Sequence, residues 1–206
     1  MIAVEIEGIL SVLMIISALS VQMRIFINPM LDSVIVQSFI LAAIAVFVGV
    51  YEASYMLIFL AVLIVLLRGF LISFLLKKKM PADPSTLRED YITTATVIVS
   101  SIFVFIISLF IYRVLLFPLI GHPLGSIGLS LIAQGILLIV TRKNSFAHVI
   151  GYIEEENGIV LLSLLVVPLP LLIEISALLD VFGIVLVSVI LVREDITHDI
   201  FEELIG

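Results

Sequence analysis

Acidic side chains interrupt the last two apolar segments of the chain, at positions where a membrane helix would meet hydrocarbon. Three consecutive glutamates, Glu154, Glu155 and Glu156, lie within one apolar run, ~15 Å deep at a rise of 1.5 Å per residue. The final segment adds Glu174 near its start and Asp180 further in. An ionised aspartate at a helix centre costs about 2.5 to 3.5 kcal/mol. These acids therefore need protonation, a cation partner or a hydrated cavity, and each of these favours a role in ion transfer.

Two basic side chains are candidate partners for these acids. Arg68 lies in an earlier apolar segment, well before the border at Lys77, so an ion pair to a carboxylate of the predicted helix 146–167 is expected; snorkelling to the headgroups is the alternative. His148 precedes Glu155 by seven residues and shares its face. It is a candidate for extending a proton path to the cytoplasm, although a histidine near the headgroups fits equally well.

The spacing of the three glutamates limits what they do together. Successive helix residues point about 100° apart, so the three fan over about 200° and cannot share one cavity. We expect at least one of them to face a neighbouring subunit. Static pairing of some of the acids, for example with Arg68 or with a hydroxyl, stays open as a structural interpretation.

Composition sets the class of element that must position these groups. The chain of 206 residues is 63% hydrophobic and 13% charged, with a mean hydropathy of +1.38, whereas soluble domains have about 25% charged residues. A soluble fold is excluded. Without cysteine the chain has no thiolate ligand for an iron–sulfur cluster. A phosphate loop and an HExxH motif are also missing, so catalysis by this chain alone is not expected, and nothing indicates nucleic-acid binding.

The apolar runs predict an all-α polytopic membrane helix bundle with about seven transmembrane helices. They are expected at about residues 4–23, 31–51, 54–76, 93–116, 125–141, 146–167 and 170–192. A very short turn between the second and third predicts a tight antiparallel hairpin. If the N-terminus is outside, eight of the ten basic residues fall in cytoplasmic loops, so the positive-inside rule predicts an N-out, C-in orientation. Residues 193–206 are predicted to form a short amphipathic helix.

Amides and glycines within the runs are interpreted as packing features. Gln37 and Gln134 are expected to tie helices together through hydrogen bonds. Glycines at 125, 128 and 135 are expected to let the fifth helix approach its neighbours closely.

The last two helices contain a specific run of residues that resembles the hydrogenase-4 component E family. The run is Arg142-Lys143-Asn144-Ser145-Phe146, Ile150-Gly151-Tyr152, Glu156-Asn157-Gly158-Ile159, Pro170-Leu171-Leu172-Ile173-Glu174 and Leu178-Leu179-Asp180-Val181-Phe182. That family is related to the K-type subunit of complex I and the C-type subunit of Mrp antiporters. The resemblance covers about residues 140–192. It implies a three-helix K-type-like unit with a short cytoplasmic tail at 121–206, after a four-helix membrane region at 1–120.

The resemblance implies a non-catalytic membrane subunit of an energy-converting group 4 NiFe hydrogenase or formate hydrogenlyase in a prokaryotic cell membrane. Such a subunit couples electron transfer in a peripheral arm to proton or sodium translocation. Peripheral subunits with the NiFe centre and iron–sulfur clusters are expected as partners, together with antiporter-like membrane subunits and lipid, and no cofactor is expected in this chain. A stand-alone cation channel or secondary transporter, or a purely structural scaffold, is the alternative.

The resemblance also ranks the acids. Glu174 matches the glutamate in the third helix of the K-type unit. Glu156 fits the Glu-Asn-Gly pattern of component E, although Ile153 stands where the complex I relative has its second glutamate. Glu154 and Glu155 exceed the family pattern.

Overall fold

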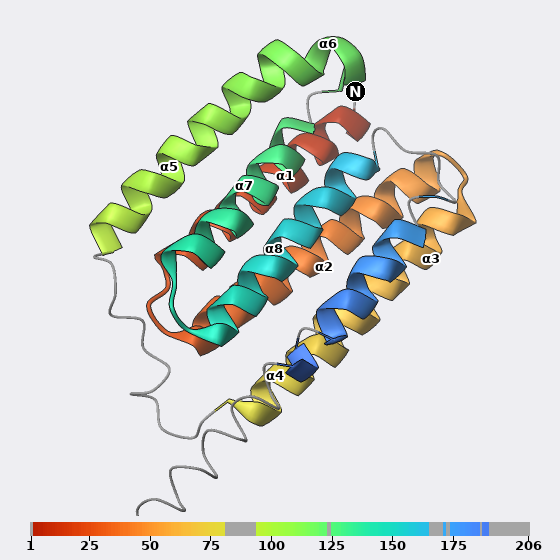
Figure 1. The fold of residues 1–206 in the computed structure, drawn as a ribbon. Helices are drawn as coiled ribbons and strands as arrows, with labels where there is room; N and C mark the ends of the chain where they lie inside the picture. The colour runs from red at the N-terminus through yellow and green to blue at the C-terminus, as the bar shows by residue number, and fades with distance from the viewer. Residues whose placement is uncertain are drawn as a thin grey trace, which may run out of the picture.

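The computed structural model describes residues 2–80, 94–122, 125–164, 171, 174–185 and 187–189. Helix accounts for 92% of these residues, and none of them forms a strand. The helices lie side by side in a bundle, with the segment 94–120 along one edge and the last helical segment along the opposite side (Figure 1). The predicted all-α class is confirmed.

The helices follow the predicted ranges closely. They are α1 (Ile2–Met23), α2 (Ile27–Tyr51), α3 (Tyr55–Ile64), η1 (Val65–Ile72), α4 (Ser73–Lys79), α5 (Thr94–Ile111), η3 (Tyr112–Leu116), α6 (Phe117–Ile120), α7 (Gly125–Thr141) and α8 (Ser145–Ser163). The two η segments are π-helical and continue the helices before them. Residues 174–185 and 187–189 are also helical and are drawn in blue in Figure 1. The predicted amphipathic tail at 193–206 lies outside the described residues.

Several helices have the length and composition of membrane spans. Within the described ranges, Ile27–Tyr51, Tyr55–Lys78 and Ala95–Ile120 are long and apolar enough to cross a bilayer. Gly8–Met23 and Gly125–Thr141 are shorter apolar helices. Large apolar side chains cover the outer face of the segment 95–120, where Phe103 and Phe110 are 63% and 68% exposed. Such a surface is typical of a bundle that meets lipid or other subunits.

The hairpin between α2 and α3 is as tight as predicted. The backbone N–H of Ser54 donates to the carbonyl of Gly49 at 2.8 Å, and Ala53 adopts the left-handed conformation with φ 53°. A Cβ atom on Gly49 would lie 3.0 Å from Cβ of Leu57. The glycine therefore lets the two helices meet directly after the turn.

Glycines join α7 and α8 along a seam in which backbone meets backbone. A Cβ atom on Gly135 would lie 2.5 Å from the carbonyl oxygen of Gly151, and one on Gly158 would lie 2.7 Å from that of Gly128. Side chains at these positions would push the helices apart. The close approach predicted for Gly128 and Gly135 is confirmed, and it fixes the helix that carries the three glutamates.

Candidate functional site

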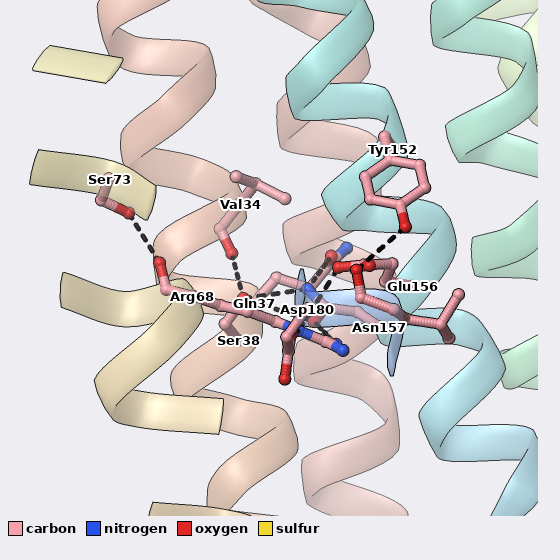
Figure 2. A network of polar contacts seen from close by, with 10 residues as sticks. Val34, Gln37, Ser38, Arg68, Ser73, Tyr152, Glu156, Asn157 and Asp180 are labelled. Carbon is pink, nitrogen blue, oxygen red and sulfur yellow. Dashed lines mark hydrogen bonds and ion pairs between the residues drawn. The ribbon is translucent and has the colours of Figure 1, made fainter. Parts of the chain in front are cut away.

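Arg68 lies at the centre of a buried polar cluster between α2, η1, α8 and the last helix (Figure 2). The side chain is on η1 and only 1% exposed. Its Nε donates to Oδ1 of Asp180 at 2.7 Å and lies 3.5 Å from Oε2 of Glu156. Its Nη1 donates to Oδ1 of Asn157 at 2.9 Å. The ion pair predicted between Arg68 and the helix that carries the three glutamates is confirmed by the contact with Glu156, in place of snorkelling, and the shorter ion pair is to Asp180 of the last helix.

The π-helical turn of η1 has its own local support. The hydroxyl of Ser73 donates to the carbonyl of Arg68 at 2.7 Å, five residues back along the chain. A Cβ atom on Gly69 would lie 3.2 Å from Cζ of Phe39, so η1 packs closely on α2. Figure 2 shows the Arg68 side chain reaching from η1 toward α8 and the last helix. Short π-helical turns are frequent at functional sites.

Neutral side chains extend the cluster from Arg68 toward Glu154. Asn157 on α8 donates through Nδ2 to Oε1 of Gln37 at 2.9 Å and to Oγ of Ser38 at 3.0 Å, both on α2. Nε2 of Gln37 in turn lies 3.5 Å from Oε1 of Glu154, which is a long hydrogen bond. The predicted role of Gln37 in joining helices is confirmed, because it links α2 to α8. No role is predicted from the sequence for Asn157 or Ser38. The Arg68 cluster comprises Arg68, Asp180, Glu156, Asn157, Gln37, Ser38 and Glu154.

The charges of the Arg68 cluster do not balance when every acid is ionised. Arg68 contributes +1, while Glu154, Glu156 and Asp180 contribute −3, so the sum is −2, and all three carboxylates are 0% exposed. Glu154 Oε2, Glu156 Oε1 and Asp180 Oδ2 have no hydrogen-bond partner among the described residues. An uncompensated buried charge is costly. We therefore expect the cluster to hold at least one proton, and proton exchange is the chemistry that its residues support.

A glycine lets the last helix pack closely against α8 beside the Arg68 cluster. Gly183 is buried, and a Cβ atom there would lie 3.2 Å from Cε1 of Tyr152 and 3.8 Å from Oε1 of Glu156. The hydroxyl of Tyr152 donates to the carbonyl of Leu179 at 3.1 Å. These contacts bring Asp180 within reach of Arg68.

Three of the predicted site residues lie apart from this network. Glu155 is half-buried, and its backbone faces Gly135 of α7. His148 shares a hydrogen bond of 2.7 Å with the carbonyl of Arg142, near the beginning of α8. Glu174 is exposed on the last helix. The structure does not bring these side chains to Arg68, and their roles in ion transfer stay predictions.

The three glutamates of α8 separate as their spacing predicts, with one difference. Glu156 lies beside Arg68 and Glu154 beside Gln37, so they have different partners. Asn157 nevertheless links the two through one hydrogen-bonded network. Both are buried because α8 packs against α2 on one side and the last helix on another.

Gln134 belongs to a second, neutral cluster. Its Nε2 donates to the carbonyl of Ser101 at 2.8 Å, and the Ser101 hydroxyl donates back to its Oε1 at 2.8 Å. Nε2 of Gln22 donates to the Gln134 carbonyl at 2.8 Å. The Gln134 cluster, which comprises these three residues, joins α1, α5 and α7, so the predicted packing role of Gln134 is confirmed.

Metal binding finds no support in the part of the chain that the structure describes, where no group of three or more His, Asp or Glu side chains has a suitable arrangement. Comparisons of the chain with family models, curated proteins and solved structures give no match. The likeness to hydrogenase-4 component E therefore rests on the run of residues in the last two helices.

Proposed function

We propose that the chain is a non-catalytic membrane subunit of a hydrogenase-type or complex I-like assembly, in which its buried carboxylates form part of a proton or sodium path. Electron transfer belongs in this proposal to peripheral partner subunits with a NiFe centre and iron–sulfur clusters. The absence of cysteine from the chain supports that division of roles. Antiporter-like subunits are the proposed neighbours within the membrane.

The proposal includes about seven transmembrane helices in a prokaryotic cell membrane, with the N-terminus outside and the C-terminus inside. The apolar helices support membrane insertion. The distribution of basic residues between the loops supports the orientation.

The observation that carries the proposal is the depth of the Arg68 cluster. Arg68 lies thirteen residues past the start of α3 at Tyr55, ~20 Å along the helix. Glu156 lies eleven residues past the start of α8 at Ser145, ~16 Å along it. In a hydrocarbon core of ~30 Å both positions are near the middle. Ionisable groups at that depth commonly mark ion and proton pathways.

The geometry supports a simple exchange step. Nε of Arg68 is 2.7 Å from Asp180 and 3.5 Å from Glu156, so a movement of the guanidinium of order 1 Å changes which carboxylate it neutralises. A proton is then favoured on the carboxylate that loses the guanidinium and released from the one that gains it. In this proposal the exposed Glu174 continues the path into a neighbouring subunit.

Removing the exchangeable groups tests the proposal. Asp180→Asn and Glu156→Gln are expected to lower coupled ion pumping in membrane vesicles by about tenfold or more, because each removes a positioned proton carrier. Hydrogenase activity of the peripheral arm with artificial acceptors is expected to persist. The control is Glu52→Gln, which makes the matched chemical change at an exposed position. Pumping that is unchanged in both cluster variants would contradict the assignment.

One observation favours a structural role for the same residues as a second candidate. The cluster joins α2, η1, α8 and the last helix through hydrogen bonds and ion pairs. If it acts only as a connection, the two cluster variants lower the yield of assembled complex, and pumping and peripheral activity fall in the same proportion. A selective loss of pumping distinguishes the conductive role.

A further inference from the structure

A groove of about 390 Å³ runs between α1 and α2 on the surface of the bundle. That volume is within the range of about 300 to 1,000 Å³ typical of ligand pockets. The lining changes in character along its length. The apolar end is lined by Leu13, Ile16 and Ile40, and the polar end by Arg24, Asp32 and Ser33.

The order of these residues matches the profile of one membrane leaflet. Arg24 follows the end of α1 and Asp32 lies near the start of α2, so the polar end is at the ends of the helices. Leu13 is eleven residues before Arg24, ~16 Å further along the helix. The groove therefore runs from headgroup depth toward the hydrocarbon.

The polar end has an unpaired positive charge. Arg24 is exposed and makes no ion pair with a described residue. Asp32 is already partnered, since its Oδ1 accepts a hydrogen bond of 2.7 Å from Nζ of Lys77. Arg24 and Lys77 contribute +2 and Asp32 contributes −1, so the net charge at this end is +1, which complements a single anionic group.

The backbone that carries Arg24 is held by a side chain from the loop between α7 and α8. Nη2 of Arg142 donates to the carbonyl of Gln22 at 2.9 Å and to that of Arg24 at 3.2 Å. The loop between α1 and α2 is thereby tied to the loop between α7 and α8. A cation on a supported loop binds a ligand with less loss of conformational entropy.

We propose that this Arg24 groove binds an anionic phospholipid, with the phosphate at Arg24 and an acyl chain along Leu13 and Ile16. A phospholipid has a charged head and an apolar chain in the same order as the lining. Basic pockets between membrane helices commonly bind such headgroups. The groove between α2 and α3 makes a contrast, because its lining, which includes Ala43 and Val62, is wholly apolar.

Quenching of a single tryptophan by brominated lipid tests the proposal, because the natural chain has no tryptophan. The full chain is prepared as Ile16→Trp, as Leu13→Trp to provide a second probe, and as Val62→Trp as the control in the apolar groove. Each is reconstituted in phosphatidylcholine vesicles containing either dibrominated phosphatidylglycerol or dibrominated phosphatidylcholine at matched mole fractions. The ratio of the two quenching efficiencies measures preference for the anionic lipid.

Tryptophan in the Arg24 groove is expected to prefer the anionic lipid by about fivefold, the effect of one basic side chain near a membrane surface. Tryptophan at position 62 is expected to show a ratio of about one. Adding Arg24→Gln is expected to bring the groove probes toward that control value, while Arg113→Gln, a change at an exposed arginine elsewhere, leaves them unchanged. Equal ratios at all three probes would overturn the proposal, as would a preference that survives Arg24→Gln. Protection of both groove probes from either lipid would also overturn it, by indicating a protein occupant.

Discussion

The bundle contains two buried polar clusters that lie on opposite sides of the α7–α8 pair and differ in charge. In the Gln134 cluster the side chains are neutral amides and a hydroxyl, and the Gln134 amide has both its nitrogen and its oxygen paired with Ser101. In the Arg68 cluster one guanidinium faces three carboxylates, several of whose oxygens lack a donor among the described residues. In the first cluster Oε1 of Gln22 lacks a donor, whereas in the second cluster four carboxylate oxygens and Nη2 of Arg68 lack hydrogen-bond partners among the described residues.

This difference distinguishes the Gln134 cluster, which connects helices, from the Arg68 cluster, which is the proposed site of proton exchange. The amides and the hydroxyl of the Gln134 cluster stay neutral, so this cluster contributes by joining helices through hydrogen bonds. An unsaturated charged cluster is costly to bury and changes state with a single proton. Under the proposed function, helices of similar apolar character therefore serve two purposes in this bundle. Four substitutions test the contrast, in order of expected effect on the free energy of unfolding.

Removing the cation of the charged cluster is expected to have the largest effect. Arg68→Leu leaves Asp180 and Glu156 buried without a guanidinium, and a loss of about 3 to 5 kcal/mol is expected. Reversible unfolding in mixed detergent, followed by circular dichroism, measures it. The control is Arg113→Leu at an exposed arginine stacked 4.5 Å from the ring of Phe117, for which about 1 kcal/mol or less is expected. Equal losses in the two variants would contradict the charged character of the cluster.

Disturbing the seam that positions α8 is expected to have the next largest effect. Gly135→Ala places a Cβ atom 2.5 Å from a backbone oxygen of α8, so the helices must separate, at a cost of about 1 to 3 kcal/mol. Gly8→Ala is the matched control, since nothing lies within 4 Å of its added Cβ. That change is expected to be neutral or to stabilise α1 by up to about 1 kcal/mol. The same unfolding assay compares them, and a similar response at both glycines would show that the seam tolerates side chains.

Breaking the neutral cluster is expected to cost less. Gln134→Leu removes both hydrogen bonds to Ser101, and side-chain hydrogen bonds between membrane helices contribute about 0.6 to 1.7 kcal/mol. Ion pumping is expected to stay at the level of the natural chain. A loss of pumping as large as that of Asp180→Asn would remove the distinction between the two clusters.

The surface ion pair of Lys77 and Asp32 provides the lower limit of the series. Its side chains are 50% and 60% exposed, so Asp32→Asn is expected to cost about 0 to 1 kcal/mol, and less at high salt. Unfolding at two ionic strengths measures both the size and the salt dependence. A loss above that of Gln134→Leu would reverse the expected order.

Much of the helix arrangement was predictable because apolar length and helix-breaking residues are local signals. The run before Tyr51 and the run after Ser54 predict a hairpin from the brevity of the turn alone. The pairing of Arg68 with a carboxylate was also predictable, since a deep arginine needs a counter-charge. Which carboxylate it meets depends on the rotation of α8 and of the last helix about their axes, and a single sequence does not fix that rotation.

The neutral members of the Arg68 cluster were harder to find. Gln37 and Gln134 look alike as isolated amides in apolar runs. Gln37, however, bonds to Asn157 and Glu154 within the Arg68 cluster, whereas Gln134 joins α7 to α5. Depth does not distinguish them, because both lie about midway along their helices. The neighbouring helix does, since Gln37 contacts α8, which carries the glutamates, whereas Gln134 contacts α5. Glu174 is the opposite case, because the family resemblance favours it as a site residue although its side chain is exposed on the surface of the bundle.

The glycine seam between α7 and α8 also bears on how the chain enters a bilayer during synthesis. A segment with three consecutive glutamates partitions poorly from the translocon as a single helix. A partner that is already in contact along its backbone offers α8 a surface that is neither water nor lipid, and in the proposed orientation the short connection 142–144 stays on the cytoplasmic side. We therefore expect α8 to enter the membrane against α7, and Glu154 and Glu156, which face away from α7, to be covered by α2 and η1, both of which precede them in the chain.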